Sequence, residues 1–372
     1  MTSLKVAWDN CFAQRNATGT GLYANQVVSQ LRKDAGIDLC VFPGWPGPPK
    51  AETSSLRRAL TFAGNLTWTH VDLPLRLWKN HFDLLHSPAF IAPLKAPCPV
   101  VITMHDVTYL LYPSYFAPSW VAYMKTIVPV TVRSAAGIIC GSENSRRDLA
   151  AAYRVSPSKI HVVPYGVDHQ RFHPQAELDS AWAREMGLKT GYVLHVGEFS
   201  YRKNIPMLLR AVAHLRSHGK WGDRQLVLAG AAKRGMLGAE EIYESIDDLE
   251  LSKTVILTGR APDEHLPGLY ANASVLVMPS RYEGFGFPVL EAMATGVPVV
   301  ASNASCLPEI SGGAAVLTPA DDPGLLADAI HEVLTQPRLV ATLKSQGLQW
   351  SRNFTWERTG RETVKIYRSV AS

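Results

Sequence analysis

The sequence predicts an α/β fold made of two Rossmann-like, doubly wound parallel sheets. Short apolar runs rich in β-branched residues recur along the chain and are bounded by Pro, Gly or Asp, as is typical of buried parallel strands. Segments with helical spacing lie between these runs, so strand and helix alternate. A chain of 372 residues is also too long for one ordinary domain.

The expected strands and helices follow in chain order. In the first half we expect strands at residues 4–8, 100–104, 137–140 and 160–163. In the second half we expect strands at residues 192–196, 225–229, 254–257 and 274–278, with helical patterns at 206–218 and 283–295. Both halves therefore show the same alternating plan.

One polar, turn-rich segment interrupts this alternation and predicts a domain boundary. Residues 164–174 read Pro-Tyr-Gly-Val-Asp-His-Gln-Arg-Phe-His-Pro. We expect an N-terminal Rossmann-like domain at 1–170 and a C-terminal Rossmann-like domain at 171–354. A last helix at 355–372 is expected to cross back to the first domain. Ligands of such folds bind beyond the carboxyl ends of the strands, so a cleft between the domains is the expected site.

Composition excludes several classes of protein. A hydrophobic fraction of 47% and a charged fraction of 19% exclude a disordered chain, a collagen-like repeat and a coiled coil. No run of about 18 apolar residues is present, and the N-terminus lacks the pattern of a signal peptide, so a cytoplasmic location is expected. The five cysteines form no close pairs, which argues against a disulfide framework and a zinc site.

The positive charge lies in the first half of the chain. Residues 1–170 hold 16 Lys and Arg against 10 Asp and Glu, a net +6, whereas residues 171–372 hold 21 against 22, a net −1. Such a balance suggests contact with a phosphorylated substrate, an anionic membrane surface or nucleic acid, or else simply solvated cations.

Basic and aromatic residues interleave at Leu56-Arg57-Arg58 through Trp68 and at Leu73-Pro74-Leu75-Arg76-Leu77-Trp78-Lys79. This pattern fits peripheral contact with the inner face of the cell membrane, and equally two helical faces packed on the domain. Nucleic acid is disfavoured because no groove-reading or stacking motif accompanies the charge.

The densest motif is Ser280-Arg281-Tyr282-Glu283-Gly284-Phe285-Gly286-Phe287-Pro288-Val289-Leu290-Glu291, between an expected strand and an expected helix. Glycines at such a junction let backbone N–H groups approach a phosphate, and a helix N-terminus adds partial positive charge. Glu283 and Glu291 could accept hydrogen bonds from two sets of hydroxyls, as on a sugar and a ribose, or could be a cap and a surface glutamate.

With these residues the sequence resembles the retaining GT-B glycosyltransferases of glycosyltransferase family 4, whose hallmark is E-x7-E in a Glu-Gly-Phe-Gly stretch. Further stretches match in the same order: Thr18-Gly19-Thr20-Gly21, Met104-His105-Asp106, Gly141-Ser142-Glu143-Asn144-Ser145, Pro164-Tyr165-Gly166-Val167-Asp168, Val196-Gly197 through Arg202-Lys203-Asn204, and Ala294-Thr295-Gly296-Val297-Pro298-Val299-Val300. The resemblance covers nearly the whole chain and implies that the N-terminal domain lies on the acceptor side and that the C-terminal domain binds the nucleotide sugar.

The resemblance implies roles for the matching residues of the second half. Glu283 would contact hydroxyls of the donor sugar and Glu291 the ribose, while Lys203 would neutralise the leaving diphosphate. Backbone amides around Phe285, Gly286 and Phe287 would meet the distal phosphate and the sugar. The family uses no metal, and the sequence has no Asp-x-Asp motif, so no metal and no cofactor are expected.

In the first half, the resemblance implies that His105 lies near the donor sugar and that Gly21, in the first strand–helix loop, nears the diphosphate. One position departs from the family, because Glu198 stands where an arginine usually supplies a second cation. Arg202 is the candidate replacement, although adjacent side chains of an extended segment point to opposite sides and would separate it from Lys203.

These implications predict a retaining, metal-independent hexosyltransferase. The Arg-Lys-Asn and His-Asp variants are most similar to mannosyltransferases, which suggests GDP-mannose as donor and a glycan or lipid-linked glycan as acceptor. The alternatives are UDP-glucose or UDP-N-acetylglucosamine as donor, a GT-B UDP-sugar epimerase, and a non-catalytic sugar-nucleotide-binding partner.

Overall fold

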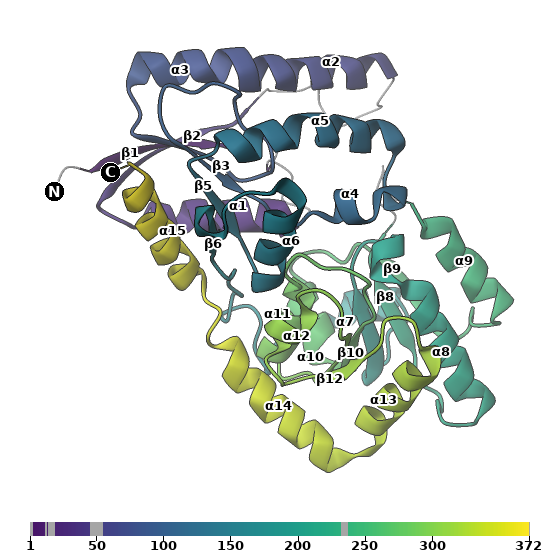
Figure 1. Ribbon diagram of the computed structural model, residues 1–372. Coiled ribbons are helices and arrows are strands. Elements are labelled where there is room, and N and C mark those ends of the chain that lie inside the picture. The colour runs from purple at the N-terminus through teal and green to yellow at the C-terminus, as the bar shows by residue number, and fades with distance from the viewer. Residues whose placement is uncertain (1–2, 12, 14–18, 45–54, 232–236, 372) are drawn as a thin grey trace. The chain divides into compact units, whose positions relative to one another are not determined.

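The computed structural model describes residues 3–11, 13, 19–44, 55–231 and 237–371, and the chain divides into two compact units (Figure 1). The first unit comprises Met1–Val107, Ala122–Gly166 and Trp356–Ser372, and the second comprises Thr108–Val121 and Val167–Thr355.

The first unit contains a six-stranded parallel sheet in the order β2-β1-β3-β4-β5-β6. Its strands are β1 (Leu4–Asp9), β2 (Ile37–Phe42), β3 (Leu84–Ser87), β4 (Val100–Thr103), β5 (Gly137–Cys140) and β6 (Ile160–Val162). The strand order reverses between β1 and β3, which places a ligand-binding edge beside these two strands.

The helices of this unit are α1 (Gly19–Leu31), α2 (Ser55–Thr67), η1 (Trp68–Asp72), α3 (Leu73–Asn80), most of α5 (Pro118–Ser134), α6 (Glu143–Tyr153), η3 (Pro157–Lys159) and α15 (Trp356–Ala371). Figure 1 shows α2 and α3 as one long rod, joined by the π-helical turn η1. The terminal helix α15 packs against α1. A Cβ at Gly360 would lie 2.5 Å from Cβ of Gln30, so the small residue permits this close contact.

The second unit contains another six-stranded parallel sheet, in the order β12-β11-β10-β7-β8-β9. Its strands are β7 (Tyr192–Val196), β8 (Leu226–Ala229), β9 (Val255–Gly259), β10 (Ala273–Met278), β11 (Val299–Ser302) and β12 (Val316–Thr318). The order reverses between β7 and β10, as in dinucleotide-binding domains.

The helices of the second unit are α4 (Thr108–Leu111), η2 (Pro113–Tyr115), α7 (Ser180–Glu185), η4 (Tyr201–Lys203), α8 (Ile205–Ser217), α9 (Ala239–Asp248), α10 (Leu266–Ala271), α11 (Phe287–Ala294), α12 (Leu307–Ser311), α13 (Pro323–Thr335) and α14 (Pro337–Ser351). Its core joins Val193 of β7 and Leu226 of β8 with Leu208 of α8 and Ile330 of α13, all completely buried. This burial holds β7, and the loop that follows it, in a fixed place.

The predicted α/β class and the eight predicted strands are confirmed, with four further strands, β2, β3, β11 and β12. The helix expected at 283–295 begins only at Phe287, because Gly286 has φ 97° and ends the preceding loop. The division of the chain also differs from the expected one at residues 108–121, which group with the second unit. Two contacts join this segment to the rest of the second unit. Leu237 N–H donates to Tyr115 O, and the rings of Tyr112 and Tyr282 lie 5.8 Å apart.

Candidate active site

The strongest cluster of charged side chains lies where the strand order of the second sheet reverses. β7 pairs with β10, so the loops that follow these two strands leave the same edge of the sheet. The loop after β7 leads through Gly197 to Lys203, and the loop after β10 carries Glu283. The fold therefore brings together two motifs that lie about 80 residues apart, at the position where such sheets bind ligands.

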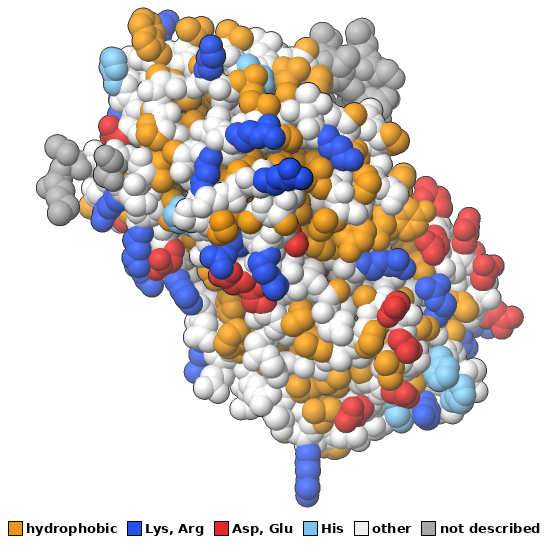
Figure 2. Space-filling model, in the orientation of Figure 1, with side chains coloured by type: hydrophobic (Ala, Val, Ile, Leu, Met, Phe, Trp, Pro, Cys, Tyr) orange, Lys and Arg blue, Asp and Glu red, His pale blue; other side chains and the backbone are white. Residues whose placement is uncertain are grey.

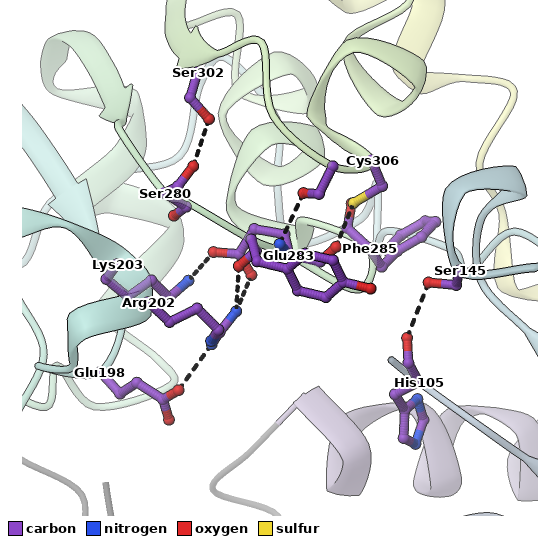
Figure 3. Close-up of polar contacts among 12 residues, drawn as sticks. His105, Ser145, Glu198, Arg202, Lys203, Ser280, Glu283, Phe285, Ser302 and Cys306 are labelled. Carbon is purple, nitrogen blue, oxygen red and sulfur yellow. Dashed lines mark hydrogen bonds and ion pairs between the residues drawn. The ribbon is translucent and has the colours of Figure 1, made fainter. Parts of the chain in front are cut away.

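Glu283 holds both cations of this cluster (Figure 3). Lys203 Nζ lies 2.8 Å from Glu283 Oε1, and Arg202 Nη1 donates to Glu283 Oε2. Arg202 Nη2 also donates to Glu198 Oε1 at 2.8 Å. Two cations thus face two carboxylates, and the cluster is electrically balanced in the free protein.

The cations determine the protonation state of Glu283. Burial by itself would raise the pKa of this carboxyl, but Arg202 and Lys203 together lower it to about 2. Glu283 is therefore a carboxylate throughout the physiological pH range, and it can accept hydrogen bonds from sugar hydroxyls.

Local backbone geometry directs Arg202 and Lys203 to the same carboxylate. Tyr201–Lys203 form the single 3-10 turn η4, not the extended segment on which neighbouring side chains would diverge. The Lys203 side chain lies over Gly197, where a Cβ would be 2.7 Å from Lys203 Cε. The structure therefore removes the geometric objection to Arg202 as a second cation.

The loop that carries Glu283 is held by hydrogen bonds to the residues just before α12. Glu283 N–H donates to Ser305 Oγ at 2.8 Å. The single S–H of Cys306 is shared between the carbonyls of Glu283 and Phe285, which lie 3.1 and 3.2 Å from Sγ. Gly286 takes the left-handed conformation, and Phe287 then begins α11. The predicted residues Phe285, Gly286 and Phe287 thus form the loop and helix N-terminus beside Glu283.

Glu291 lies about one turn into α11 and has a different environment. It is 7% exposed and accepts a hydrogen bond from Tyr270 Oη at 2.7 Å. Burial raises the pKa of its carboxyl to about 7, opposed by Tyr270 and by the charges of Arg171 and Lys203. Glu283 and Glu291 therefore differ in charge state near neutral pH.

His105 belongs to the first unit, in the loop after β4. Its Nε2–H donates to Pro88 O at 3.0 Å, because a carbonyl can only accept, so Nδ1 accepts from Tyr165 Oη at 2.9 Å. Ser145 Oγ donates to the His105 carbonyl at 3.3 Å (Figure 3). Burial lowers the pKa of His105 to about 4, so the ring is neutral. Both ring nitrogens are thus occupied, and its predicted contact with the donor sugar stays a prediction.

Gly21 lies in a helix and not in the loop that the sequence predicted. Gly19 and Gly21 form the first turn of α1, and Gly21 is buried there. Thr18, the first residue of this motif, lies outside the described residues.

Sequence reasoning missed His195 and Tyr270. His195 Nδ1 lies 2.9 Å from Val277 O and must donate to it, which leaves Nε2 as an acceptor that is buried without a hydrogen bond. Burial and the charge of Lys203 lower the pKa of His195 to about 4. Neither residue stands in a glycine-rich motif. The pairing of β7 with β10 reveals His195, and the packing of α10 beside α11 reveals Tyr270. Within the described ranges, no three His, Cys, Asp or Glu side chains are grouped as metal ligands.

Comparison with known proteins places this geometry in a family. The family model described as Glycosyltransferase Family 4 matches residues 17–171, and that of Glycosyl transferases group 1 matches residues 181–350. The MMP alpha-(1->4)-mannosyltransferase of Mycolicibacterium hassiacum is 30% identical over 360 residues, covering 91% of this chain and 80% of that one. The chain belongs to glycosyltransferase family 4 and is a glycosyltransferase.

Another relative and two solved structures are similar to this chain. The O-antigen chain mannosyltransferase B of Escherichia coli is 30% identical over 295 residues, or 79% of this chain and 76% of that one. Sucrose-phosphate synthase from Thermosynechococcus elongatus superposes with a TM-score of 0.75 at 21% identity, covering 99% of both chains. Anabaena HepE in complex with UDP and glucose superposes with a TM-score of 0.73 at 20% identity, covering 98% of this chain and 100% of that one. These likenesses show the GT-B fold.

Proposed function

We propose that this family 4 glycosyltransferase moves mannose from GDP-mannose onto a glycan or lipid-linked glycan, with retention at the anomeric carbon. The donor sugar rests on two relatives of about 30% identity that are named as mannosyltransferases. The chemistry rests on Glu283, Arg202 and Lys203, which form one buried cluster at the switch point of the second sheet.

The single observation that carries the proposal is the ion pairing of Glu283 with both cations. A donor diphosphate is a stronger partner for Arg202 and Lys203 than one carboxylate, because it offers more charge and more acceptor oxygens. When the diphosphate takes these cations, Glu283 is released to accept hydrogen bonds from donor-sugar hydroxyls. The cations then stabilise the charge that develops on the leaving diphosphate.

The proposed step balances without a covalent enzyme intermediate. The bond between the anomeric carbon and the diphosphate oxygen breaks, and its electron pair stays on that oxygen. The acceptor hydroxyl attacks the same face of the sugar and gives its proton to the leaving phosphate. Arg202 and Lys203 take the part that a metal plays elsewhere, so turnover should withstand a chelator such as EDTA.

The test is nucleotide release from GDP-mannose, UDP-glucose, UDP-galactose and UDP-N-acetylglucosamine without an acceptor. We expect slow release from GDP-mannose, abolished by Lys203→Ala and unchanged by Lys365→Ala, a control at an exposed ion pair on α15. Release from a UDP-sugar instead would favour the alternative donors, UDP-glucose or UDP-N-acetylglucosamine. HepE, which has the same fold, has been solved in complex with UDP and glucose.

The same assay separates the remaining alternatives. A GT-B UDP-sugar epimerase would convert one UDP-sugar to another without net nucleotide release. A non-catalytic partner would bind nucleotide yet release none, even when polyprenyl-linked acceptors are supplied. Either result would overturn the proposed transferase.

We also propose that the first unit docks on an anionic membrane surface, at the inner face of the cell membrane, through the outer face of α3. Leu73 and Leu77 are buried in a core cluster with Trp68. On the outer face of α3, Leu75 is 52% exposed and Trp78 is 65% exposed, and Val71 of the preceding turn η1 is 50% exposed. Arg76 and Lys79 flank this face and are exposed. Figure 2 shows hydrophobic and basic side chains interspersed where Figure 1 places α2, α3 and α5.

An apolar stripe flanked by cations is suited to lie in the headgroup region of anionic lipids. The side chains of Arg57 and Arg58, named with this stretch, lie outside the described part of the chain. No helix among the described residues is long and apolar enough to cross a bilayer.

Vesicle co-sedimentation tests this docking. We expect binding to vesicles containing phosphatidylglycerol, little binding to phosphatidylcholine alone, and release by high salt. Leu75→Ser with Trp78→Ser should weaken binding about 30- to 150-fold, because it removes roughly 2–3 kcal/mol of apolar burial. Leu325→Ser, at a leucine of α13 that is 48% exposed, is the matched control. Equal binding by all variants would contradict the proposal.

A further inference from the structure

We infer that Glu198 is a positioning residue that aims the Arg202 guanidinium at the donor diphosphate; this inference rests on the proposed function. Glu198 occupies a place where a carboxylate would repel a diphosphate, so its presence needs a compensating role. The structure supplies one, because Glu198 Oε1 accepts a hydrogen bond from Arg202 Nη2 at 2.8 Å.

The two carboxylates of the cluster hold different nitrogens of the same guanidinium. Glu198 takes Nη2, whereas Glu283 and the carbonyl of Tyr282 take Nη1, the latter at 3.2 Å. A guanidinium is planar and its donors diverge in a rigid fork. Anchoring Nη2 therefore fixes the direction in which Nη1 points.

Because the two carboxylates hold different nitrogens, we expect donor binding to change the hydrogen-bond partner of Nη1 and to leave that of Nη2 unchanged. When the diphosphate arrives and Glu283 turns to the sugar, Nη1 loses its carboxylate and can donate to a phosphate oxygen. Nη2 stays on Glu198, so Arg202 does not have to search for its orientation. A side chain as long as arginine otherwise loses much rotamer freedom when it is ordered on a ligand.

Exposure separates an inner pair from an outer pair in the cluster. The side chains of Lys203 and Glu283 are each 6% exposed, whereas those of Arg202 and Glu198 are 14% and 20% exposed. Water screens the outer carboxylate more than the inner one, so its repulsion of a diphosphate is weakened while its short hydrogen bond to Arg202 persists. The geometry thus favours Glu198 as an anchor over Glu198 as a repulsive charge.

The inference makes Glu198 act through Arg202, and a double-mutant cycle tests that dependence. The proteins are wild type, Glu198→Gln, Arg202→Gln and the double variant, each measured for kcat and for donor KM. We expect Glu198→Gln to lower kcat about tenfold and Arg202→Gln to lower it about 30- to 100-fold. The kcat of the double variant should match that of Arg202→Gln, because an anchor without its arginine has no further effect on the chemical step.

Calorimetric binding of GDP and UDP to the same four proteins gives a readout that does not require turnover. Glu198→Gln should tighten the nucleotide in the Arg202→Gln background, where only its repulsion is removed. The tightening should be smaller, or reversed, when Arg202 is present, because the anchor is then lost as well. Glu362→Gln, at an exposed ion pair on α15, serves as the control, and thermal unfolding verifies that each variant is folded.

The outcomes are distinguishable. Multiplicative losses of kcat, or an equal shift of nucleotide affinity in both backgrounds, would overturn the anchoring role of Glu198. A wild-type protein that binds GDP or UDP but transfers from no donor would defeat the proposed function, and the calorimetric cycle would still decide the role of Glu198. Failure of wild type to bind either nucleotide would overturn both.

Discussion

The ammonium of Lys203 lies 2.8 Å from the carboxylate of Glu283, and the two residues are 5% exposed each. The cation expected to meet the diphosphate and the carboxylate expected to meet the sugar therefore hold one another in the free protein. A buried ion pair of this kind contributes little net stability, but removing one partner leaves a costly unpaired charge. Under the proposed function, the donor diphosphate would separate the members of this pair when it binds.

Replacing Glu283 should change turnover and nucleotide affinity in opposite directions. In Glu283→Gln we expect kcat to fall about 100-fold, because the sugar hydroxyls lose their charged acceptor. Affinity for GDP should rise several-fold, since Arg202 and Lys203 no longer have a competing carboxylate. Steady-state kinetics and calorimetry measure both, with Glu332→Gln, an exposed glutamate of α13, as control. A parallel loss of kcat and of GDP affinity would disprove the role of Glu283 as the acceptor for the sugar hydroxyls.

Glu291 should make stability depend on pH. Burial raises its pKa from 4.5 to about 7 in the folded protein, so the folded state binds a proton more tightly than the unfolded state. The resulting stability, at most about 3 kcal/mol, is complete below pH 4.5 and is lost as the pH rises through 7.

The variant Glu291→Gln lacks this titration and keeps an acceptor for Tyr270. We expect its urea unfolding midpoint to match wild type at pH 5 and to exceed it at pH 8. Other groups titrate alike in both proteins, so the difference isolates Glu291. Parallel pH profiles of the two proteins would contradict the assignment.

The contact between Gly230 and Gly197 should tolerate no side chain. A Cβ on Gly230 would lie 1.7 Å from Gly197 O, and this backbone bears the Lys203 loop. We expect Gly230→Ala to lower the free energy of unfolding by more than about 3 kcal/mol or to prevent folding. Gly219→Ala is the control, because nothing lies within 4 Å of its Cβ and only its φ of +67° is strained, at about 1 kcal/mol. Similar denaturation midpoints for the two variants would refute the steric argument.

The terminal helix α15 should be held to the first unit partly by a buried hydrogen-bond chain. Tyr367 Oη contacts His86 Nδ1 at 2.5 Å, and His86 Nε2 contacts Thr103 Oγ1 at 2.8 Å. Burial lowers the pKa of His86 to about 3, so the ring is neutral. Tyr367→Phe leaves Nδ1 without its partner and should cost about 1–3 kcal/mol of unfolding free energy, measured by urea titration. Unchanged stability would mean that water replaces the hydroxyl.

Much of the fold could be predicted because buried parallel strands have a strong local pattern. Runs such as Tyr192–Val196 are apolar on both faces and end at Gly or Pro, so they differ from their neighbours. The strands that were missed carry weaker patterns. Ile37–Phe42 lies at the sheet edge with a mixed burial pattern, and Val316–Thr318 is only three residues long.

The sequence by itself determined the two α/β units, eight of the strands and the residues of the E-x7-E loop. Each of these depends on spacing within a short segment, which composition and periodicity record. Only the tertiary structure decided which of these residues meet. The pairing of β7 with β10 sets Glu283 against Arg202 and Lys203, and the packing of α10 beside α11 gives Glu291 its tyrosine. The charge state of a glutamate follows from its burial and its neighbours. The sequence alone therefore could not predict a pKa of about 2 for Glu283 and of about 7 for Glu291.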